Sequence, residues 1–421
     1  MVYDASIVAG TTLVTNLMND QIHQWRRYHL RYPTVVELGH DRLAFFCRGC
    51  LGDCEDGVGL PFWKTYAFTV TAVTNAAGEH VGYHNVSQLV EVLADYSLSH
   101  NLVIRRVANS ENLVAVGGQH GGMYWDRHPP ELRDGIRSLV HSGSVDELLR
   151  SRPWMSPSSH DGSTLLIDGR HPHCMTARGR RNEGRCEYDG RISLVQHRDR
   201  WLIYVRQNIQ FYGSRFTQVA QSEGTSHAGP YGPFRTIRIE DYSEFRDAAN
   251  MYFTAVNTHP LDPSMLIALF PVNMGDNEPN SEGESFIASA VSCDGVQWSE
   301  FTKLVWSTPT PYGRTWDHPV DGLAVAGGAV YFFLNLDVER ISDNELRARI
   351  QQYRFDTTAL EAQAQRAREG WGAGCRTPPH GSCPVYASSE KGDSLDEGNG
   401  WDFFVKLDCL QRTLVVEGEG S

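Results

Sequence analysis

The chain has 421 residues and a formal net charge of −13 at neutral pH, and 41% of its residues are hydrophobic. This content is enough for a packed core, but the length exceeds the roughly 250–300 residues at which single cores stop growing unless the chain closes into a ring of repeats. The acidic balance disfavours partners with phosphate backbones or acidic lipid headgroups, so we expect neither nucleic acid nor a membrane as partner. A neutral or weakly polar substrate fits this charge better.

Nine cysteines without regular spacing indicate mostly reduced thiols, and together with the absence of a signal peptide they slightly favour a cytoplasmic protein. The clusters at 47–56 and 168–174 lack the paired spacing of zinc sites, so we expect no metal. We expect no cofactor either, because the sequence contains no glycine-rich nucleotide loop and no nucleophile elbow. The chemistry must then come from its own side chains.

In chain order, aromatic and β-branched residues predict strands at 41–47 and 63–73. Short helices are predicted at 86–93, where Asn85 would be the cap, and at 131–140 and 145–150. A longer helix is predicted at 358–369. Strands at 402–407 and 412–417 would complete a blade together with strands from the N-terminus.

Between these elements the chain repeats itself. Polar residues lead into an apolar strand near residues 41, 100, 189, 250 and 321, and each such strand is soon followed by another. Divergent repetition at this spacing is typical of four-stranded propeller blades. The sequence therefore predicts an all-β protein, a five-bladed β-propeller forming one domain over residues 1–421, with short helical insertions near 127–160 and 357–400.

The innermost strands of a propeller start near one opening of its central channel, so polar residues at these strand starts are the candidate site. Hydrolysis at an acetal centre needs two carboxyl groups, one of them with a raised pKa. Asp189 is the first candidate for catalysis, since Glu187 and Arg191 concentrate charge beside it, and Asp321 and Asp41 are the candidate partners. The alternative for these aspartates is an ordinary turn, in which Asp caps its own backbone.

Arg206 and Arg215 lie on the strands that follow Asp189, where they would bind an anionic group or form salt bridges with Glu187 or Asp189. The full set of residues expected to contact substrate is Glu187, Arg191, His100, Asn101, Arg206, Arg215, Asp247, Asn250 and His318.

The stretch from Glu187 to Ile192, followed by the strand at 201–204, resembles the blade opening of five-bladed propeller glycosidases of the invertase and arabinanase superfamily and of the related β-mannoside phosphorylases. The stretch at 292–298 is similar to their outer-strand turn. The resemblance implies that Asp189 and Arg191 match the acid and the arginine of the motif, although Gly190 stands where those enzymes often have proline. It implies a glycoside hydrolase or transglycosidase; the alternative is a non-catalytic propeller that binds a glycan or a protein.

Overall fold

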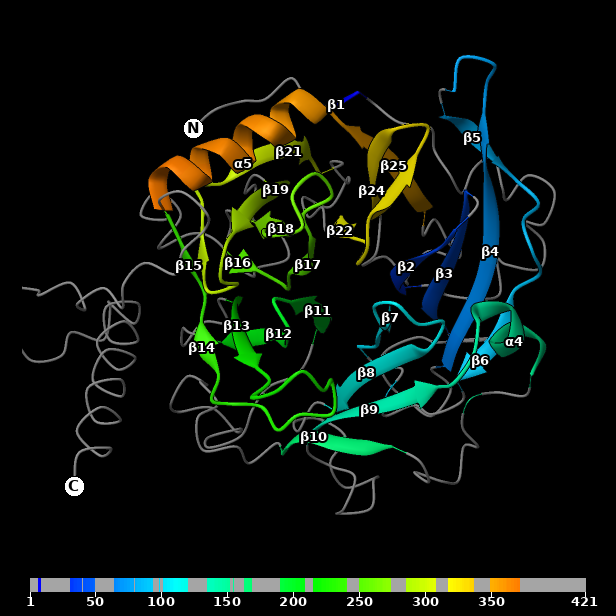
Figure 1. Cartoon of the computed structure of the whole chain (residues 1–421), viewed down its shortest axis with the longest axis horizontal. Helices are drawn as coiled ribbons and strands as arrows, with labels where there is room; N and C mark the ends of the chain where they lie inside the picture. Colours follow the sequence, from blue (N-terminus) through cyan, green and yellow to red (C-terminus); the bar gives the residue numbers. More distant parts are fainter. Residues whose placement is uncertain are drawn as a thin grey trace, which may run out of the picture.

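Five antiparallel sheets surround a central channel in the computed structural model of the chain (Figure 1). The structure describes residues 7–8, 31–39, 41–49, 64–78, 80–93, 98, 101–119, 135–151, 154, 163–168, 190–208, 215–240, 250–273, 285–307, 317–336 and 349–371. The predicted five-bladed, all-β propeller is confirmed.

Each blade runs from an innermost strand outward. Blade 1 contains β2 (Arg31–Gly39), β3 (Arg42–Gly49), β4 (Lys64–Thr74) and β5 (His80–His84), and β6 (Val90–Leu93) also pairs with β4. Blade 2 contains β7 (Val103–Arg106), β8 (Leu113–Gln119), β9 (Gly135–His141) and β10 (Thr164–Asp168). Blade 3 contains β11 (Ser193–His197), β12 (Arg200–Asn208), β13 (Arg215–Gln221) and β14 (Arg235–Thr236).

The last two blades have divided innermost strands. Blade 4 contains β16 (Asn250–Met251), β17 (Ala255–Thr258), β18 (Leu266–Asn273), β19 (Ser285–Ser292) and β21 (Thr302–Trp306). Blade 5 contains β22 (His318–Pro319), β23 (Ala324–Ala326), β24 (Ala329–Leu336), β25 (Arg349–Phe355) and β1 (Ile7–Val8). A parallel pair, β15 (Arg238–Ile239) and β20 (Gln297–Trp298), links blades 3 and 4.

The N-terminal strand β1 closes the ring. It pairs antiparallel with β25, so a segment from the start of the chain becomes the outer strand of the last blade. Such closure protects a sheet edge that would otherwise stay open. The two closing strands predicted at 402–407 and 412–417 lie outside the described residues.

Two helices are confirmed. α4 (Val145–Arg150) begins after Ser144, whose hydroxyl accepts from the Glu147 amide, while the Glu147 carboxylate accepts from the Ser144 amide at 2.7 Å. This capping box satisfies two amides that the first helical turn leaves open. α5 (Thr357–Trp371) lies along the outside of blade 4 (Figure 1), where Gln363 donates to the backbone of Ser289 at 3.4 Å.

The other two predicted helices are wrong where the structure describes them. Residues 86–89 have no regular structure, and β6 follows at Val90–Leu93. Most of 131–140 is the strand β9, which belongs to blade 2 rather than to an insertion. Both segments pair with a long strand beside them, and pairing within a sheet overrides a weak local helix preference.

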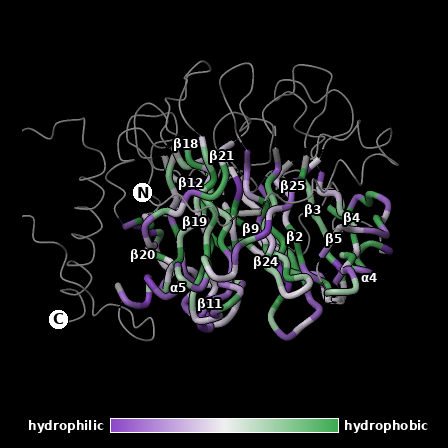
Figure 2. Tube along the Cα trace, turned by 90° about the horizontal axis from the view of Figure 1, so that it is seen from above, coloured by the Kyte–Doolittle hydropathy of each residue, from purple (hydrophilic) through white to green (hydrophobic). Residues whose placement is uncertain are grey.

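The apolar core lies between neighbouring blades, and Figure 2 shows hydrophobic residues concentrated along the strands. Between blades 1 and 5, the fully buried Phe45 ring packs 5.1 Å from Phe68 and 5.3 Å, edge to face, from Phe333. Burying a side chain of this size stabilises the fold by about 2 kcal/mol. The innermost strands also contact one another, β2 with β7 and β23, and β11 with β7 and β17, so they line the channel together.

The turn at 292–298 has the structural role that its sequence favours. The Asp294 carboxylate accepts from the amides of Val296 and Gln297 at 2.8 Å, and Gly295 adopts a φ of +79°. These bonds position Trp298 in the core between blades 3 and 4.

Cys293, beside this turn, is disulfide-bonded, whereas Cys47 is a free buried thiol. The expectation of mostly reduced thiols therefore holds for Cys47 and is wrong for Cys293. Within the described part of the chain, no helix is long and apolar enough to cross a membrane.

Candidate functional site

The channel has two openings, which differ in the side chains that reach them. The innermost strands start around the opening that we call the start mouth, near Tyr32, Tyr252 and His318. They end around the opposite opening, the end mouth, where one cavity is lined by residues of all five blades. The parallel bridge between Thr34 and Asp321 confirms that the innermost strands of blades 1 and 5 run in the same direction.

Aromatic rings from three segments meet at the start mouth. The rings of Tyr32 and Tyr252 lie nearly parallel to the His318 imidazole, with centroids 5.7 and 5.3 Å away, and their hydroxyls are 3.3 Å apart. Phe253 packs edge-on against His318 at 4.9 Å. Tyr32, Phe253 and His318 are buried and Tyr252 is half-buried. We call these four residues the aromatic cluster; within it, Tyr252 is the ring most open to a ligand.

Three buried arginines surround the aromatic cluster. The guanidinium carbon of Arg48 lies 5.0 Å from the centre of the Tyr32 ring, and that of Arg206 lies 5.6 Å from the centre of Tyr252. Both contacts are within the range of cation–π attraction. The third arginine, Arg191, donates to Thr34 Oγ1 at 2.6 Å and to the Pro319 carbonyl at 3.4 Å. The mouth therefore combines aromatic faces with cationic groups.

Arg191 remains charged although it is fully enclosed. Burial lowers the pKa of its guanidinium to about 10, and the nearby Asp321 carboxylate acts in the opposite direction. At neutral pH the group is still protonated, so it provides a fixed positive charge just inside the start mouth. Cys47 lies close enough to feel this charge, but burial dominates and raises the pKa of its thiol to about 12, so the thiol is not a nucleophile at neutral pH.

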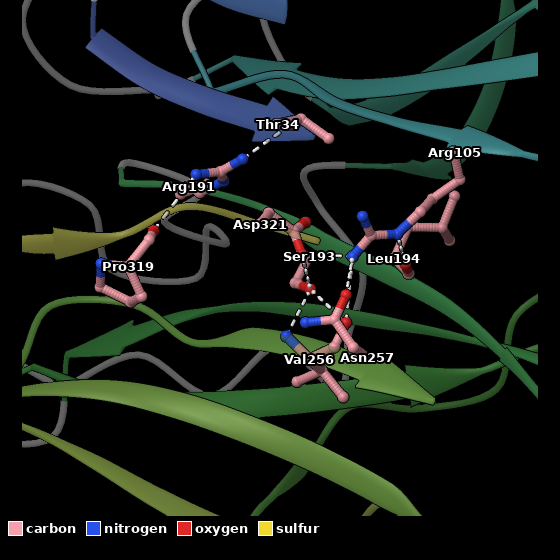
Figure 3. Close-up of polar contacts among 9 residues, drawn as sticks. All are labelled: Thr34, Arg105, Arg191, Ser193, Leu194, Val256, Asn257, Pro319 and Asp321. Carbon is pink, nitrogen blue, oxygen red and sulfur yellow. Dashed lines mark hydrogen bonds and ion pairs between the residues drawn. The ribbon is translucent and has the colours of Figure 1, made fainter. Parts of the chain in front are cut away.

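Asp321 is fully buried in the middle of the channel (Figure 3). Its Oδ1 atom forms an ion pair with Arg105 of blade 2 and accepts from Ser193 of blade 3 at 3.4 Å. Ser193 in turn accepts from the Val256 amide at 2.9 Å, and Arg105 also donates to the Asn257 side chain at 3.2 Å. This carboxylate thus connects four blades, and its observed bonds are those of a structural group.

Sequence reasoning missed Asp317. This residue is 3% exposed and directly precedes β22 at the start mouth. Asp317 lies four residues before Asp321 on the innermost segment of blade 5. The signal was available, since Asp317 precedes its innermost strand much as Asp189 precedes Gly190 and Arg191. The pattern of a polar residue before an apolar run points instead to Asp321, four residues later.

The structure brings together some of the predicted site residues and separates others. Arg191, Arg206 and His318 lie at the start mouth. Asn101 is buried near them, but its side-chain oxygen accepts from the Gly118 amide at 2.8 Å, so it holds two strands of blade 2 together.

Asp41 is not at a strand start. It lies in the exposed turn between β2 and β3, with a φ of +59°, and it lines the end mouth. The alignment of Asp41 with the other strand starts is therefore wrong, because residue 42 begins the second strand of its blade. For Arg215 on β13 and Asn250 on β16 the structure describes only the strand positions. Outside the described residues lie Asp189, Glu187, His100 and Asp247.

The described residues contain no group of three or more His, Cys, Asp or Glu side chains that would hold a metal ion. What they provide at the start mouth is an aromatic surface, fixed positive charge and one buried carboxyl group, that of Asp317. The roles assigned to the individual residues from the sequence stay predictions.

Solved structures with similar folds include carbohydrate-active proteins. An N-acetylgalactosamine deacetylase from F. plautii, in complex with blood group B trisaccharide, is 12% identical over 79% of this chain and 91% of that chain, with a TM-score of 0.43. A glycoside hydrolase family 43 arabinoxylan arabinofuranohydrolase from Bacillus subtilis is 10% identical over 78% of this chain and 63% of that chain, with a TM-score of 0.45.

A third structure comes from the GH130 family of mannoside phosphorylases, which contains glycoside hydrolases that target β-1,2-mannosidic linkages in Candida mannan. It is 12% identical over 78% of this chain and 84% of that chain, with a TM-score of 0.41. No protein-family model matches the sequence, and no curated protein does. The resemblance suggested by the motifs therefore extends to solved glycoside hydrolases, and at these identities and TM-scores it is a likeness of fold that carries no argument about activity.

Proposed function

We propose that the protein acts on a carbohydrate at the start mouth, as a glycoside hydrolase or transglycosidase. The observation that supports this best is the aromatic cluster, with the half-buried Tyr252 beside Arg206 at the opening of the channel. A sugar ring offers apolar faces and a rim of hydroxyl groups. A site with exposed aromatic surface and a few convergent polar groups complements both.

Two carboxyl groups would carry the reaction. Asp189 is the first, because it precedes the innermost strand of blade 3, and we add Asp317, which precedes that of blade 5. One would protonate the leaving-group oxygen while the other acts as base or nucleophile, at a separation of about 5–9.5 Å between the carboxyl groups. Asp321 is the weaker candidate because Arg105 and Ser193 already occupy its Oδ1 atom.

Turnover assays on matched variants test this proposal. Wild-type protein is screened for product release from a panel of aryl glycosides and sulfated polysaccharides, and Asp189→Asn and Asp317→Asn are assayed on each substrate that is turned over. We expect either variant to lose at least about 100-fold in activity, since each removes a general acid or base, with little change in melting temperature.

Asp199→Asn is the control. Asp199 lies in a hairpin turn at the end mouth with a φ of +61°, which asparagine adopts readily. This variant should keep full activity. Full activity in both Asp189→Asn and Asp317→Asn would show that these carboxyl groups do not carry the reaction.

A second function, glycan binding without turnover, is favoured by Asp321. The Asp321 carboxylate is fully buried and already forms an ion pair with Arg105, as a structural group does. A propeller that only binds would show calorimetric affinity for a glycan, no product release, and the same affinity in Asp189→Asn.

A further inference from the structure

A second candidate site lies at the end mouth, opposite the aromatic cluster. Here the channel opens into a cavity of about 1100 Å³, which is large enough for a small organic ligand. All five blades contribute to its lining, through residues such as Asp41, Arg105, Gln196, Asn257 and Ala324. None of the four residues of the aromatic cluster lines this cavity, and Arg105, which does, pairs with Asp321 (Figure 3).

Arg105 lies at the floor of this cavity and is held rigidly. Its Nε atom donates to the Leu194 carbonyl at 2.7 Å, and its Nη2 atom donates to the Val256 carbonyl at 3.0 Å, to Asn257 and to Asp321. Its Nη1 atom has no hydrogen-bond partner among the described residues, and the side chain is 14% exposed. Two nitrogens of the guanidinium thus fix its orientation, and the third, Nη1, leaves its N–H groups available to a ligand in the cavity that Arg105 lines.

At the floor itself two guanidinium groups lie near one carboxylate, whereas the other buried carboxyl group of the described channel, that of Asp317, lies at the start mouth. Arg105 and Arg191 are both cationic, and Asp321 is the carboxylate between them. Arg191 bonds only to the neutral oxygens of Thr34 and Pro319. A buried positive charge without its own counter-ion is costly, and an anion on the open side of Arg105 would offset part of that cost.

The rim of the cavity limits the kind of anion. Arg42 pairs with Asp146, and Arg106 pairs with Glu111, so these two arginines are already neutralised. The acidic residues at the rim, such as Asp41, would repel a ligand with many negative charges. A ligand with one negative charge is repelled less, and at the floor that charge meets Arg105.

The amide side chains in the lining favour hydroxyl groups on the same ligand. Gln196 and Asn257 both line the cavity, and amides bind hydroxyls as donors and as acceptors. We propose that the end mouth binds a small polyhydroxylated molecule with a single carboxylate or sulfate, such as a sugar acid, whose anionic oxygen accepts from Nη1 of Arg105. This site is independent of the function proposed for the start mouth.

Calorimetric titration of the full chain tests the proposal with three probes: D-glucuronate, D-glucose 6-sulfate and the neutral D-glucose. We expect at least one of the two anionic probes to bind and glucose not to. The one that binds distinguishes a carboxylate site from a sulfate site. In the double variant Arg105→Gln/Asp321→Asn, which removes both charges of the ion pair, binding should weaken about 10- to 100-fold, as expected for the loss of a charge-assisted hydrogen bond.

Arg106→Gln is the matched control, because Arg106 also lines this mouth but pairs with Glu111. It should bind like the wild type. If the double variant does not fold, Arg105→Lys replaces it, since lysine keeps a positive charge beside Asp321 but lacks the outward Nη1 atom, and the same direction of change is expected.

Four results would overturn the proposal. The first three are no binding of either anionic probe to the wild type, binding of glucose as tight as that of the anions, and a loss of affinity in Arg106→Gln as large as that in the Arg105 variant. The fourth result is binding that is lost in Tyr252→Ala but kept in the Arg105 variant, which would place the anion at the start mouth.

Discussion

Replacing Asp321 by asparagine removes the carboxylate that balances Arg105 in the middle of the channel. Breaking a buried ion pair from one side costs about 3–5 kcal/mol, because it leaves an uncompensated charge. The charge directly paired with Asp321 is that of Arg105, which is 14% exposed and partly hydrated through the end mouth. We therefore expect a loss near the lower end of this range, about 3 kcal/mol.

The reverse change should cost more. Arg105→Gln leaves the Asp321 carboxylate, which is fully buried, with Ser193 as its hydrogen-bond donor. We expect a loss of about 4–5 kcal/mol in the free energy of unfolding. The double variant removes both charges, so its loss should fall at least about 2 kcal/mol short of the sum of the two single losses.

Urea denaturation followed by circular dichroism measures all three losses. Additive losses, within about 0.5 kcal/mol, would refute the ion pair as the link between the blades. The same experiment separates a structural Asp321 from a catalytic one. If Asp321 were catalytic, the Asp321→Asn variant would lose activity with little change in stability. The structure predicts instead a clear loss of stability.

Three further predictions concern single side chains. Burial lowers the pKa of His259 from 6.5 to about 4, so the unfolded chain binds the proton first as the pH falls. About 3 kcal/mol of the stability present above pH 6.5 should therefore be lost by pH 4. His259→Asn should remove this part of the pH dependence of unfolding. Gly322→Ala should lower the free energy of unfolding by about 2–4 kcal/mol, because Gly322 has a φ of +113° and an added Cβ would lie 2.6 Å from Val35 Cγ1. Gly224 has open space around it, so Gly224→Ala should change the free energy of unfolding by less than about 0.5 kcal/mol. Tyr252→Ala should weaken glycan binding about tenfold in calorimetry, because it removes the accessible ring of the aromatic cluster, and unchanged affinity would count against that cluster as the contact surface.

Much of the fold could be predicted from sequence because its signals are local. Apolar strands recur along the chain, and the short helix at 145–150 begins with a capping serine. The turn residues were less informative. In sequence Asp41 precedes an apolar run as the other candidate strand starts do, yet it belongs to the hairpin turn between β2 and β3 at the opposite mouth. Only the pairing of β2 with β3 identifies the innermost strand of that blade.

The candidate site was harder to predict because its contacts are non-local. Arg105 and Asp321 are 216 positions apart, and no local pattern indicates that they pair. The strand β22 has two residues, one of them proline, so it lacks the apolar run that marks a strand in sequence. The sequence pattern therefore does not mark Asp317, directly before it, as a residue at a strand start.

The most direct test of the proposed function is a crystal structure of the protein bound to a neutral glycan that it recognises in the panel. We predict a sugar ring packed on Tyr252, within about 4 Å of the aromatic ring, at the mouth where the innermost strands start. A sugar bound on the outer strands of a blade, with no contact to the aromatic cluster, would contradict the central claim.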